Sequence, residues 1–451
     1  MKYAIRNTAL FILFYCIALI TAAQTIVLQN VNIIDGTGNA LQTNKNVVIK
    51  DGVIAAITTG QQMPKDATVV NLQGKTIMPA IISVHNHIGT LKGTTTNGNN
   101  YTRDNLLSQL NKYESYGVST ILCMGTDRPL IFNGFRDSSV AGLLPGARLY
   151  SAGFGFGVPS GGPPMAMGMD RVFRPATPED VVKEIDTLVA LKPTVVKMWV
   201  DDFGGKLPKM KPEIYETIIK EAHIHGIRTA AHVYYLADAH KLVAAGLDIL
   251  AHSIRDKDID DTLLQMMKQK GVVYIPTLSL DDYAYIYARR PEWINDAFFK
   301  ASLEPGVYEM ITSQAYQDNI KNSPDYQKNM AAFETALRNV LKVFKAGILV
   351  ALGTDSGATP VRTQGFSEHL EMELLTQAGL TPMEAITVAT KNAATVLKIN
   401  KQYGTIQTGM KANFIVLGAD PLADIKNTRK IEAVYKNGIE VSKGPLNTAG
   451  Q

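Results

Sequence analysis

Six side chains able to bind a metal ion lie at the carboxyl ends of short apolar runs. These runs are TIMPAIISVHNH, TVVKMW, IRTAAHV, LDILAHS and GILVALGTDSG. The six side chains are His85, His87, Lys197, His232, His252 and Asp355. Residues this far apart in sequence can meet only if the runs are parallel strands closed into a barrel, whose carboxyl ends share one face. The chain is therefore predicted to have a parallel α/β fold.

Strand-like runs alternate with helical segments through the middle of the chain, as in 211–226 and 238–246. The alternation favours βα units around a parallel sheet. The eight runs centre on residues 81–87, 118–125, 148–155, 194–200, 227–233, 247–253, 272–278 and 347–355. Eight such units predict a TIM-type (β/α)8 barrel with insertions. The insertions 153–176 and 280–345 are expected to shape or cover the substrate site, with a surface or oligomer contact as the alternative.

The two ends of the chain differ from this middle part. Short strands with Gly and Asn turns fill residues 24–78, and the same style returns at 404–442. Both segments are expected to build one small antiparallel β domain. The predicted organisation has a signal peptide at 1–23, the two β segments around a barrel at 79–403, and a tail at 443–451.

The first 23 residues have the features of an export signal. Lys2 and Arg6 make the start positive, an apolar stretch of 11 residues runs from Leu10 to Ile20, and Thr21-Ala22-Ala23 supply small residues before a cleavage point. The alternative is a membrane anchor, but a span needs about 20 residues. The protein is therefore expected to be periplasmic or secreted. Cleavage would leave Cys123 as the single cysteine, which excludes an internal disulfide.

Composition excludes other classes of protein. A content of 46% hydrophobic and 19% charged residues is that of a globular chain. The net charge of +4 comes without a basic run, so nucleic acid is not an expected partner. The expected partner is a small-molecule substrate.

The pair His85 and His87 can chelate one ion, because residues i and i+2 of a strand face the same side. A second pair, His223 and His225, lies in a helical segment where such residues diverge, so both are expected at the surface. His240 is expected on a helix surface as well. His369 begins a later helix, where helix packing is favoured over a contact at the rim of the site.

Lys197, if carboxylated, and Asp355 would supply the anionic ligands. A lysine buried in VVKMW has a lowered pKa, and its free amine can take up CO2 to become a bridging carbamate; a lysine that snorkels to solvent is the alternative. His232 and His252 suit a second ion. Asp355 could orient a metal-bound hydroxide, accept its proton and pass that proton to a leaving nitrogen. This combination is the layout of a metal-dependent hydrolase.

The chain resembles the amidohydrolase superfamily, particularly its imidazolonepropionase-like and prolidase-like members, over residues 25–442. The resemblance rests on the segments NVNIIDGTG, LQGKTIMPAIISVHNH, VVKMWVDD, AAHVYYLADA, ILAHSIRD, LGTDSG, EHLEMELLTQAGLTPMEAITVATKNAA and GTIQTGMKANFIVLGADPL. It implies a distorted TIM barrel plus a β-sandwich built from both chain ends, and a possible homo-oligomer. It also implies two zinc ions: one held by His85, His87 and Asp355, the other by His232 and His252, with carboxylated Lys197 between them. Asp201 and Asp202 come too late in the strand to take the place of Lys197.

Two departures from the family pattern stand out. Ala80 and Ser83 replace a usual Gly and Asp in the segment before His85, and Asn413 replaces a usual Asp near the end of the chain. No metal ligand is lost. Ser83 lies one layer deeper than His85 on the same strand face, so an acceptor beneath the ligands is expected to be missing.

Substrate choice is poorly encoded. Tyr234 and Arg255 follow His232 and His252, and could hold a substrate carboxylate or make structural hydrogen bonds. The expected reaction is hydrolysis of an amide-type C–N bond in an acylated amino acid, a dipeptide or a cyclic amide. The alternatives are an esterase or lactonase with the same site, or a catalytically silent binding protein that would bind little zinc.

Overall fold

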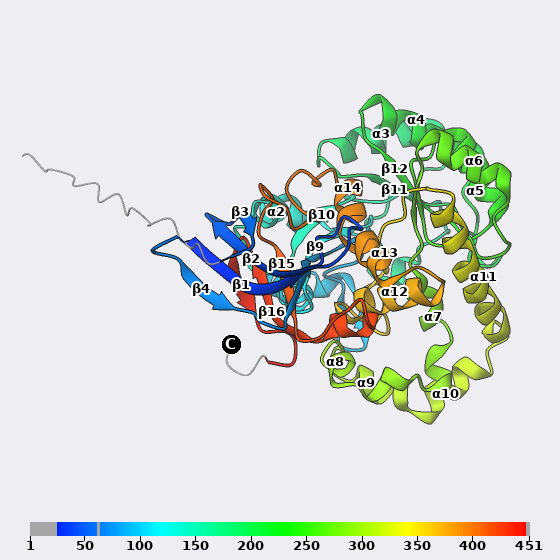
Figure 1. Cartoon of the computed structure of the whole chain (residues 1–451). Helices are drawn as coiled ribbons and strands as arrows, with labels where there is room; N and C mark the ends of the chain where they lie inside the picture. Colours follow the sequence, from blue (N-terminus) through cyan, green and yellow to red (C-terminus); the bar gives the residue numbers. More distant parts are fainter. Residues whose placement is uncertain (1–24, 61–63, 448–451) are drawn as a thin grey trace, which may run out of the picture.

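The computed structural model describes residues 25–60 and 64–447 (Figure 1). The expected signal peptide at 1–23 lies outside these residues. An eight-stranded sheet forms one side of the molecule, and the parallel strands with their covering helices form the other. Within the described ranges, no helix combines the length and apolarity needed to cross a membrane.

Strands from both chain ends share the eight-stranded sheet. Its members are β1 (Thr25–Ile33), β2 (Gln42–Lys50), β3 (Val53–Thr58), β4 (Thr68–Asn71), β5 (Thr76–Pro79), β15 (Phe414–Leu417), β16 (Ile431–Lys436) and β17 (Ile439–Ser442). The order is β17-β16-β15-β5-β1-β2-β3, with β4 also on β1. The antiparallel pairing of β5 with β15 joins the two ends of the chain, and its apolar side chains help to form a separate core.

A bulge in β1 explains how one strand pairs with both β4 and β5. The register against β2 shifts between Leu28 and Val31, where Asn30 has a φ of 59°. Before the bulge β1 pairs with β4, and after it with β5. Asn tolerates this left-handed backbone better than most residues, so the bulge is locally encoded. Because β4 and β5 both pair with β1 in parallel, the single continuous sheet is mixed, and the purely antiparallel domain expected from the sequence is wrong.

Two parallel sheets carry the middle of the chain. One has the order β10-β9-β6 and the other β11-β12-β13-β14. Their bounds are β6 (Ile81–Asn86), β9 (Val118–Cys123), β10 (Arg148–Ser151), β11 (Val196–Trp199), β12 (Thr229–His232), β13 (Ile249–Ala251) and β14 (Val273–Ile275). A parallel bridge between Phe156 and Met198 links the two sheets on one side. These seven strands fall inside the first seven runs predicted from sequence.

The eighth predicted run, 347–355, is not a regular strand. It makes a parallel bridge from Val350 to Tyr274 of β14 and accepts a 2.8 Å hydrogen bond at Leu352 from Val84 of β6. It therefore links the parallel sheets on their other side. Gly353 permits the close approach, because a Cβ at that position would lie 2.6 Å from the Cβ of His85. The segment makes too few backbone hydrogen bonds to count as a regular strand, but it is held against β6.

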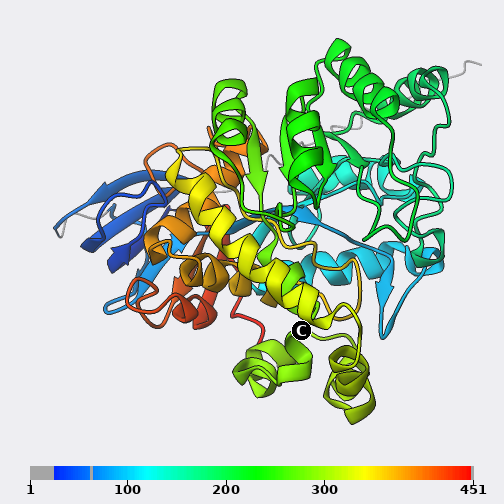
Figure 2. The same ribbon diagram turned by 90° about the vertical axis from the view of Figure 1, so that its right-hand side faces the viewer.

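Helices cover the outside of the parallel strands (Figure 2). The principal ones are α1 (Arg103–Ser115), α3 (Pro178–Val189), α4 (Pro212–Ile224), α5 (Leu236–Ala245), α6 (Asp261–Lys270), α11 (Tyr326–Lys345), α12 (Phe366–Gln377), α13 (Pro382–Thr387) and α14 (Ala393–Val396). Local signals set several ends: Thr177 forms a capping box with Asp180 at the start of α3. The helices predicted at 211–226 and 238–246 are confirmed as α4 and α5.

The insertion at 280–345 holds several short helices before α11. It includes most of α7 (Leu278–Tyr283), together with α8 (Ala297–Lys300), α9 (Val307–Thr312) and α10 (Gln314–Lys321). In both views α8–α10 lie at the lower edge, away from α3–α6 at the top. The other insertion, 153–176, contains one 3-10 turn at Met165–Met167 and is otherwise irregular.

Candidate metal centre

The structure brings all six predicted side chains into one buried cluster. Asp355 Oδ1 lies 2.9 Å from His87 Nε2 and 3.3 Å from His85 Nε2. His85 Nε2 also lies 3.3 Å from the amine of Lys197. The ring of His252 is centred 4.4 Å from that of His85 and 4.2 Å from that of His232. The cluster therefore runs without a break from His87 to His232.

Burial keeps the nitrogen atoms of the cluster available as ligands. It lowers the pKa of His85 to about 3, with the nearby Lys197 as the second cause. Burial likewise lowers the pKa of His232 and, more strongly, that of His252. Imidazoles with such pKa values are neutral at pH 7, which is the form that binds metal ions. Burial lowers the pKa of Lys197 to about 7, so a large fraction of its amine is uncharged near neutral pH.

Asp355 stays ionised in this buried cluster. Burial alone would raise the pKa of its carboxyl, but Arg362 and His87 oppose that effect and hold the pKa well below its usual range. The carboxylate is divided between two neighbours: Oδ1 faces the imidazoles, and Oδ2 accepts a hydrogen bond from Arg362. The anionic ligand therefore has a fixed orientation.

Backbone strain is concentrated at the same place. His252 has a φ of 85°, Asp355 a φ of 58° and Thr277 a φ of 52°. A residue other than glycine seldom adopts this left-handed region, and such strain collects at functional sites. Thr277 is the hydrogen-bond partner of His252 Nδ1 at 2.8 Å. Fixing the direction of these side chains offsets the backbone cost.

The arrangement differs from the sequence expectation in two details. The tightest group of donor atoms is His85, His252 and Asp355, whose ligand atoms all lie within 4.8 Å of one another. The family resemblance placed His252 with His232 at the second ion, bridged to the first ion by Lys197. Asp201, judged too late in the strand to take the place of Lys197, reaches the other end of the cluster, where its Oδ2 lies 3.3 Å from His232 Nε2. Strand β11 ends at Trp199, so the chain is free to bring this carboxylate back.

The residues that orient the ligands were missed in the sequence. The Thr126 hydroxyl lies 2.6 Å from His87 Nδ1, and the Thr277 hydroxyl lies 2.8 Å from His252 Nδ1. Both follow parallel strands that carry no predicted ligand at their ends. The rule that found His232, a polar side chain at the carboxyl end of a run, would have found Thr126 if applied to residues other than metal ligands.

The acceptor expected to be missing beneath the ligands is not supplied for His85, whose buried Nδ1 has no hydrogen-bond partner among the described residues. A glutamate on α12 instead accepts from residues beside the ligands. Glu368 accepts hydrogen bonds from Asn86 at 2.9 Å, Thr354 at 2.7 Å and Ser356 at 2.9 Å. The Ser83 hydroxyl also donates to it, at 3.4 Å. The Ser83 hydroxyl, at the position where the family pattern has an aspartate, therefore donates a hydrogen bond to a buried glutamate from another element.

The two candidate substrate contacts form a pair at the rim. The guanidinium of Arg255 lies 4.7 Å above the ring of Tyr234. Arg255 is buried, makes a 2.8 Å ion pair with Asp281 and donates to the carbonyls of Ser253 and Val233. Most of its hydrogen-bonding capacity is thus used within the protein.

The remaining histidines lie away from the cluster. His223 and His240 are paired with surface aspartates at 2.8 Å, and His225 lies 3.7 Å from Asp186. His369 is buried, with Nδ1 2.9 Å from the Thr428 hydroxyl and Nε2 2.9 Å from the Tyr116 carbonyl. The prediction that His369 packs within the fold is confirmed.

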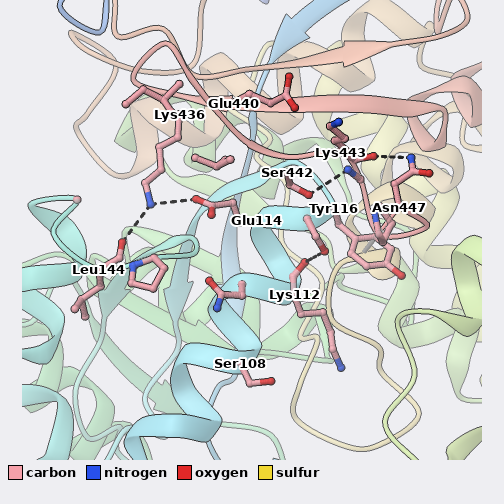
Figure 3. A pocket seen from close by; sticks show the side chains of 18 of the residues that line it. Ser108, Lys112, Glu114, Tyr116, Leu144, Lys436, Glu440, Ser442, Lys443 and Asn447 are labelled. Carbon is pink, nitrogen blue, oxygen red and sulfur yellow. Dashed lines mark hydrogen bonds and ion pairs between the residues drawn. The ribbon is translucent and has the colours of Figure 1, made fainter. Parts of the chain in front are cut away.

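A cavity lies at the amino end of the parallel strands, opposite the cluster (Figure 3). Its volume is about 1190 Å³, and it is lined by the second half of α1, the loop 142–145 and the segment around β17. Lys436 and Glu114 form a 3.0 Å ion pair there. None of the six cluster residues lines this cavity, so it lies apart from the candidate site.

A group of buried imidazoles, a lysine and a carboxylate at the carboxyl ends of parallel strands defines the metal-dependent hydrolase class. The chain belongs to the amidohydrolase family, whose model matches residues 76–441. The chain is therefore an amidohydrolase, an enzyme that acts on a carbon–nitrogen bond.

Known relatives agree with this assignment. The ochratoxinase of Aspergillus niger is 26% identical over 92% of this chain and 85% of its own length. A putative prolidase from Bifidobacterium longum has a similar fold, with a TM-score of 0.71 at 23% identity, covering 94% of this chain and 96% of that one. A Xaa-Pro dipeptidase with bound methionine gives a TM-score of 0.71 at 20% identity, covering 92% and 99%.

Proposed function

We propose that the cluster binds two zinc ions and hydrolyses the amide bond of a small acylated amino acid, dipeptide or cyclic amide. One ion would be held by His85, His87 and Asp355, and the other by His232 and His252. Carboxylated Lys197 would bridge them. The supporting observation is the convergence of four buried imidazoles on Lys197 and Asp355, with pKa values lowered at three of them.

The donor set fits two cations. Burying a cluster this polar is costly unless the groups are paired or bind a metal ion. Neutral imidazole nitrogens and carboxylate oxygens are the ligands that zinc takes in catalytic sites. A carbamate on Lys197 would add the anion needed between two positive ions. The uncharged amine is the form that reacts with CO2, so burial of Lys197 favours the modification.

The chain's own residues then assign the proton path. Bound cations would polarise the scissile carbonyl and lower the pKa of a water molecule. Asp355 would accept a proton from that water and deliver it to the leaving nitrogen. Thr126 and Thr277 would hold the rings of His87 and His252 in position. Tyr234 and Arg255 would line the substrate side of the site.

The same proposal covers the architecture and the location of the protein. The bridges around the parallel strands support a distorted (β/α)8 barrel at 79–403. The strands from 24–78 and 404–442 share one eight-stranded sheet, which supports a β domain beside the barrel rather than a sandwich of two sheets. Removal of residues 1–23 on export would leave a periplasmic or secreted enzyme, for which the family resemblance implies a homo-oligomer. N-terminal sequencing from a secreting host should begin near Gln24.

The test combines metal content with a substrate panel. Metal-free protein would be loaded with zinc, its metal content measured, and N-acyl amino acids, Xaa-Pro dipeptides, cyclic amides and lactones offered to it. We expect two zinc ions per chain and hydrolysis of at least one amide class. Tight zinc binding with turnover of lactones alone would replace the amide proposal by the esterase alternative. Little bound zinc and no turnover would favour a silent binding protein.

A further inference from the structure

Arg362 stands out because it touches the proposed catalytic carboxylate and remains accessible. It lies in the loop between Asp355 and α12 and donates to Asp355 Oδ2. Its backbone is fixed by two hydrogen bonds: Gly357 N–H donates to its carbonyl at 2.8 Å, and its own N–H donates to Thr359 at 3.1 Å. The side chain is 26% exposed. Among the described residues its guanidinium has no other hydrogen-bond acceptor, so several donors remain free.

The other cations at the site lack this property. Lys197 is fully buried and faces His85. Arg255 is only 8% exposed and is engaged by Asp281, two backbone carbonyls and the face of Tyr234. A guanidinium with free donors is well suited to bind a carboxylate through two parallel hydrogen bonds. Arg362 therefore offers the accessible anion contact at this edge of the site.

The opposite edge of the cluster carries several apolar side chains beside the carboxylate of Asp201. The ring of Phe203 stacks on His232, with ring centres 5.4 Å apart and an angle of 21°. Trp199 lies beside Lys197, whose amine is 5.3 Å from the ring centre. These two aromatic residues pack with Met167, Met169 and Val172 from the insertion 153–176. Methionine side chains adapt to differently shaped apolar groups. We call these five residues the apolar wall.

The proposed proton path orients a substrate between these two edges. Asp355 delivers its proton to the leaving nitrogen, so the leaving amine lies on the side of Asp355. In an amino acid the carboxylate carbon is two bonds from that nitrogen, and Arg362 contacts Asp355 directly. The acyl group lies on the other side of the scissile bond, toward His232 and the apolar wall.

Resting on the proposed function, we infer that the substrate is an N-acyl amino acid with an apolar acyl group. Arg362 binds the carboxylate of the leaving amino acid, and the apolar wall receives the acyl group. Hydrolysis breaks the C–N bond, adds hydroxyl to the acyl carbon and leaves a hydrogen on the amine nitrogen. Arg362 is thus a determinant of specificity.

The test compares a carboxylate with its neutral counterpart on the zinc-loaded full chain. The probes are N-benzoylleucine, N-benzoylleucinamide and N-acetylleucine. We expect the wild-type protein to hydrolyse N-benzoylleucine with the highest kcat/KM. Arg362→Met should lower kcat/KM for both substrates, because Arg362 also orients Asp355, but the loss should be on the order of 100-fold larger for N-benzoylleucine than for N-benzoylleucinamide, mainly through KM. Arg362→Lys should retain part of the preference.

The control is Arg338→Met, because Arg338 is an exposed arginine that pairs with Asp258 at 2.9 Å. It should leave both rates unchanged. The ratio of the two substrates does not depend on the fraction of folded enzyme, so partial misfolding cannot imitate the result. Equal losses on both substrates in Arg362→Met would overturn the inference and leave Arg362 as a residue that only positions Asp355.

A separate variant tests whether the apolar wall binds the acyl group. Phe203→Ala should lower the preference for benzoyl over acetyl by about 10-fold, because an aromatic contact is lost on one side of the bond only. An unchanged preference would overturn this half of the inference. A wild-type enzyme that binds two zinc ions but hydrolyses none of the three amides, while cleaving Xaa-Pro dipeptides or cyclic amides, would reject the inference and leave the proposed function standing. Failure on every amide would reject both.

Discussion

The two ends of the parallel strands use charge in opposite ways. At the amino end, Lys436 lines the cavity of about 1190 Å³. It forms a 3.0 Å ion pair with Glu114 and donates a hydrogen bond to the Gly146 carbonyl. At the carboxyl end, imidazoles face one another, and Lys197 has no carboxylate within ion-pair distance among the described residues. The comparison teaches that a cavity whose lysine is paired with a glutamate has a structural role. A dense cluster of buried polar groups without matching counter-charges instead indicates a catalytic site.

The largest effect on activity is expected from substitution of Lys197 at the carboxyl end of the strands. Lys197→Arg should lose at least one zinc ion and at least about 1000-fold in kcat/KM, about 4 kcal/mol of barrier. Guanidinium stays charged and cannot form a carbamate. Metal analysis and steady-state kinetics measure both effects.

The exposed Lys220, paired with Glu221 at 3.4 Å, supplies the matched control Lys220→Arg. Bicarbonate or short carboxylic acids should restore part of the activity of Lys197→Ala. If Lys197→Arg kept two zinc ions and normal turnover, the bridge would be wrong. The site would then be mononuclear, built on His85, His87, His232 and Asp355.

A second test uses pH to show that the carboxyl end carries an uncompensated charge. Asp127 follows β9, accepts a 3.0 Å hydrogen bond from Tyr101, and has its pKa raised by burial to about 6 from an ordinary 3.8. The folded chain therefore holds this proton to higher pH than the unfolded chain. Its contribution to stability is present below about pH 4 and is lost as pH rises to about 6, a change of about 3 kcal/mol.

Asp127→Asn removes this titration. Relative to wild type, the metal-free variant should gain about 3 kcal/mol in free energy of unfolding between pH 4 and pH 7. Urea unfolding of both proteins at the two pH values measures the difference. Parallel pH profiles for the two proteins would contradict the assignment of an uncompensated carboxyl at this end.

A smaller effect is expected from the residue that orients His87. Thr126→Val keeps the shape of the side chain but removes the hydroxyl that lies 2.6 Å from His87 Nδ1. Loss of such a partner typically costs about 10- to 100-fold in metal affinity or activity. A zinc titration against a competing chelator measures the affinity. Thr187→Val, at an exposed site on α3, should leave it unchanged. Equal affinities in all three proteins would show that Thr126 does not orient the ligand.

The smallest effect on activity is expected at the amino end. Lys436→Met should leave kcat/KM and zinc content within about twofold of wild type, because none of the six cluster residues lines the cavity that contains Lys436. It should still lower the free energy of unfolding by about 2 kcal/mol, since Glu114 stays buried without its cation. A large loss of activity with intact folding would erase the contrast between the two ends.

Periodicity and strand-end placement allowed much of the fold to be predicted. The seven regular parallel strands lie where apolar runs indicated, because a buried parallel strand needs such a run. The eighth run failed as a regular strand: Gly353 brings it against His85 at the expense of ladder bonds. That close approach depends on a residue 268 positions earlier, which no local pattern contains.

The candidate site divides in the same manner. The six cluster residues could be named because strand ends concentrate them at one face. Asp201, Glu368 and Arg362 could not be placed, because each belongs to a loop or a helix start whose direction is set by packing. The proximity of Asp201 to His232, at 3.3 Å, follows from where β11 stops.

The sequence by itself determined the class of the protein and the six side chains around which its chemistry is proposed. These follow from side-chain type and strand periodicity, which are local properties. The tertiary structure alone decided how the charges are shared: Asp355 lies between the imidazoles and Arg362, and Glu368 accepts a hydrogen bond from Ser83. The reason is physical. Burial and pairing depend on distances between segments far apart in sequence, and these distances exist only once the parallel strands have come together.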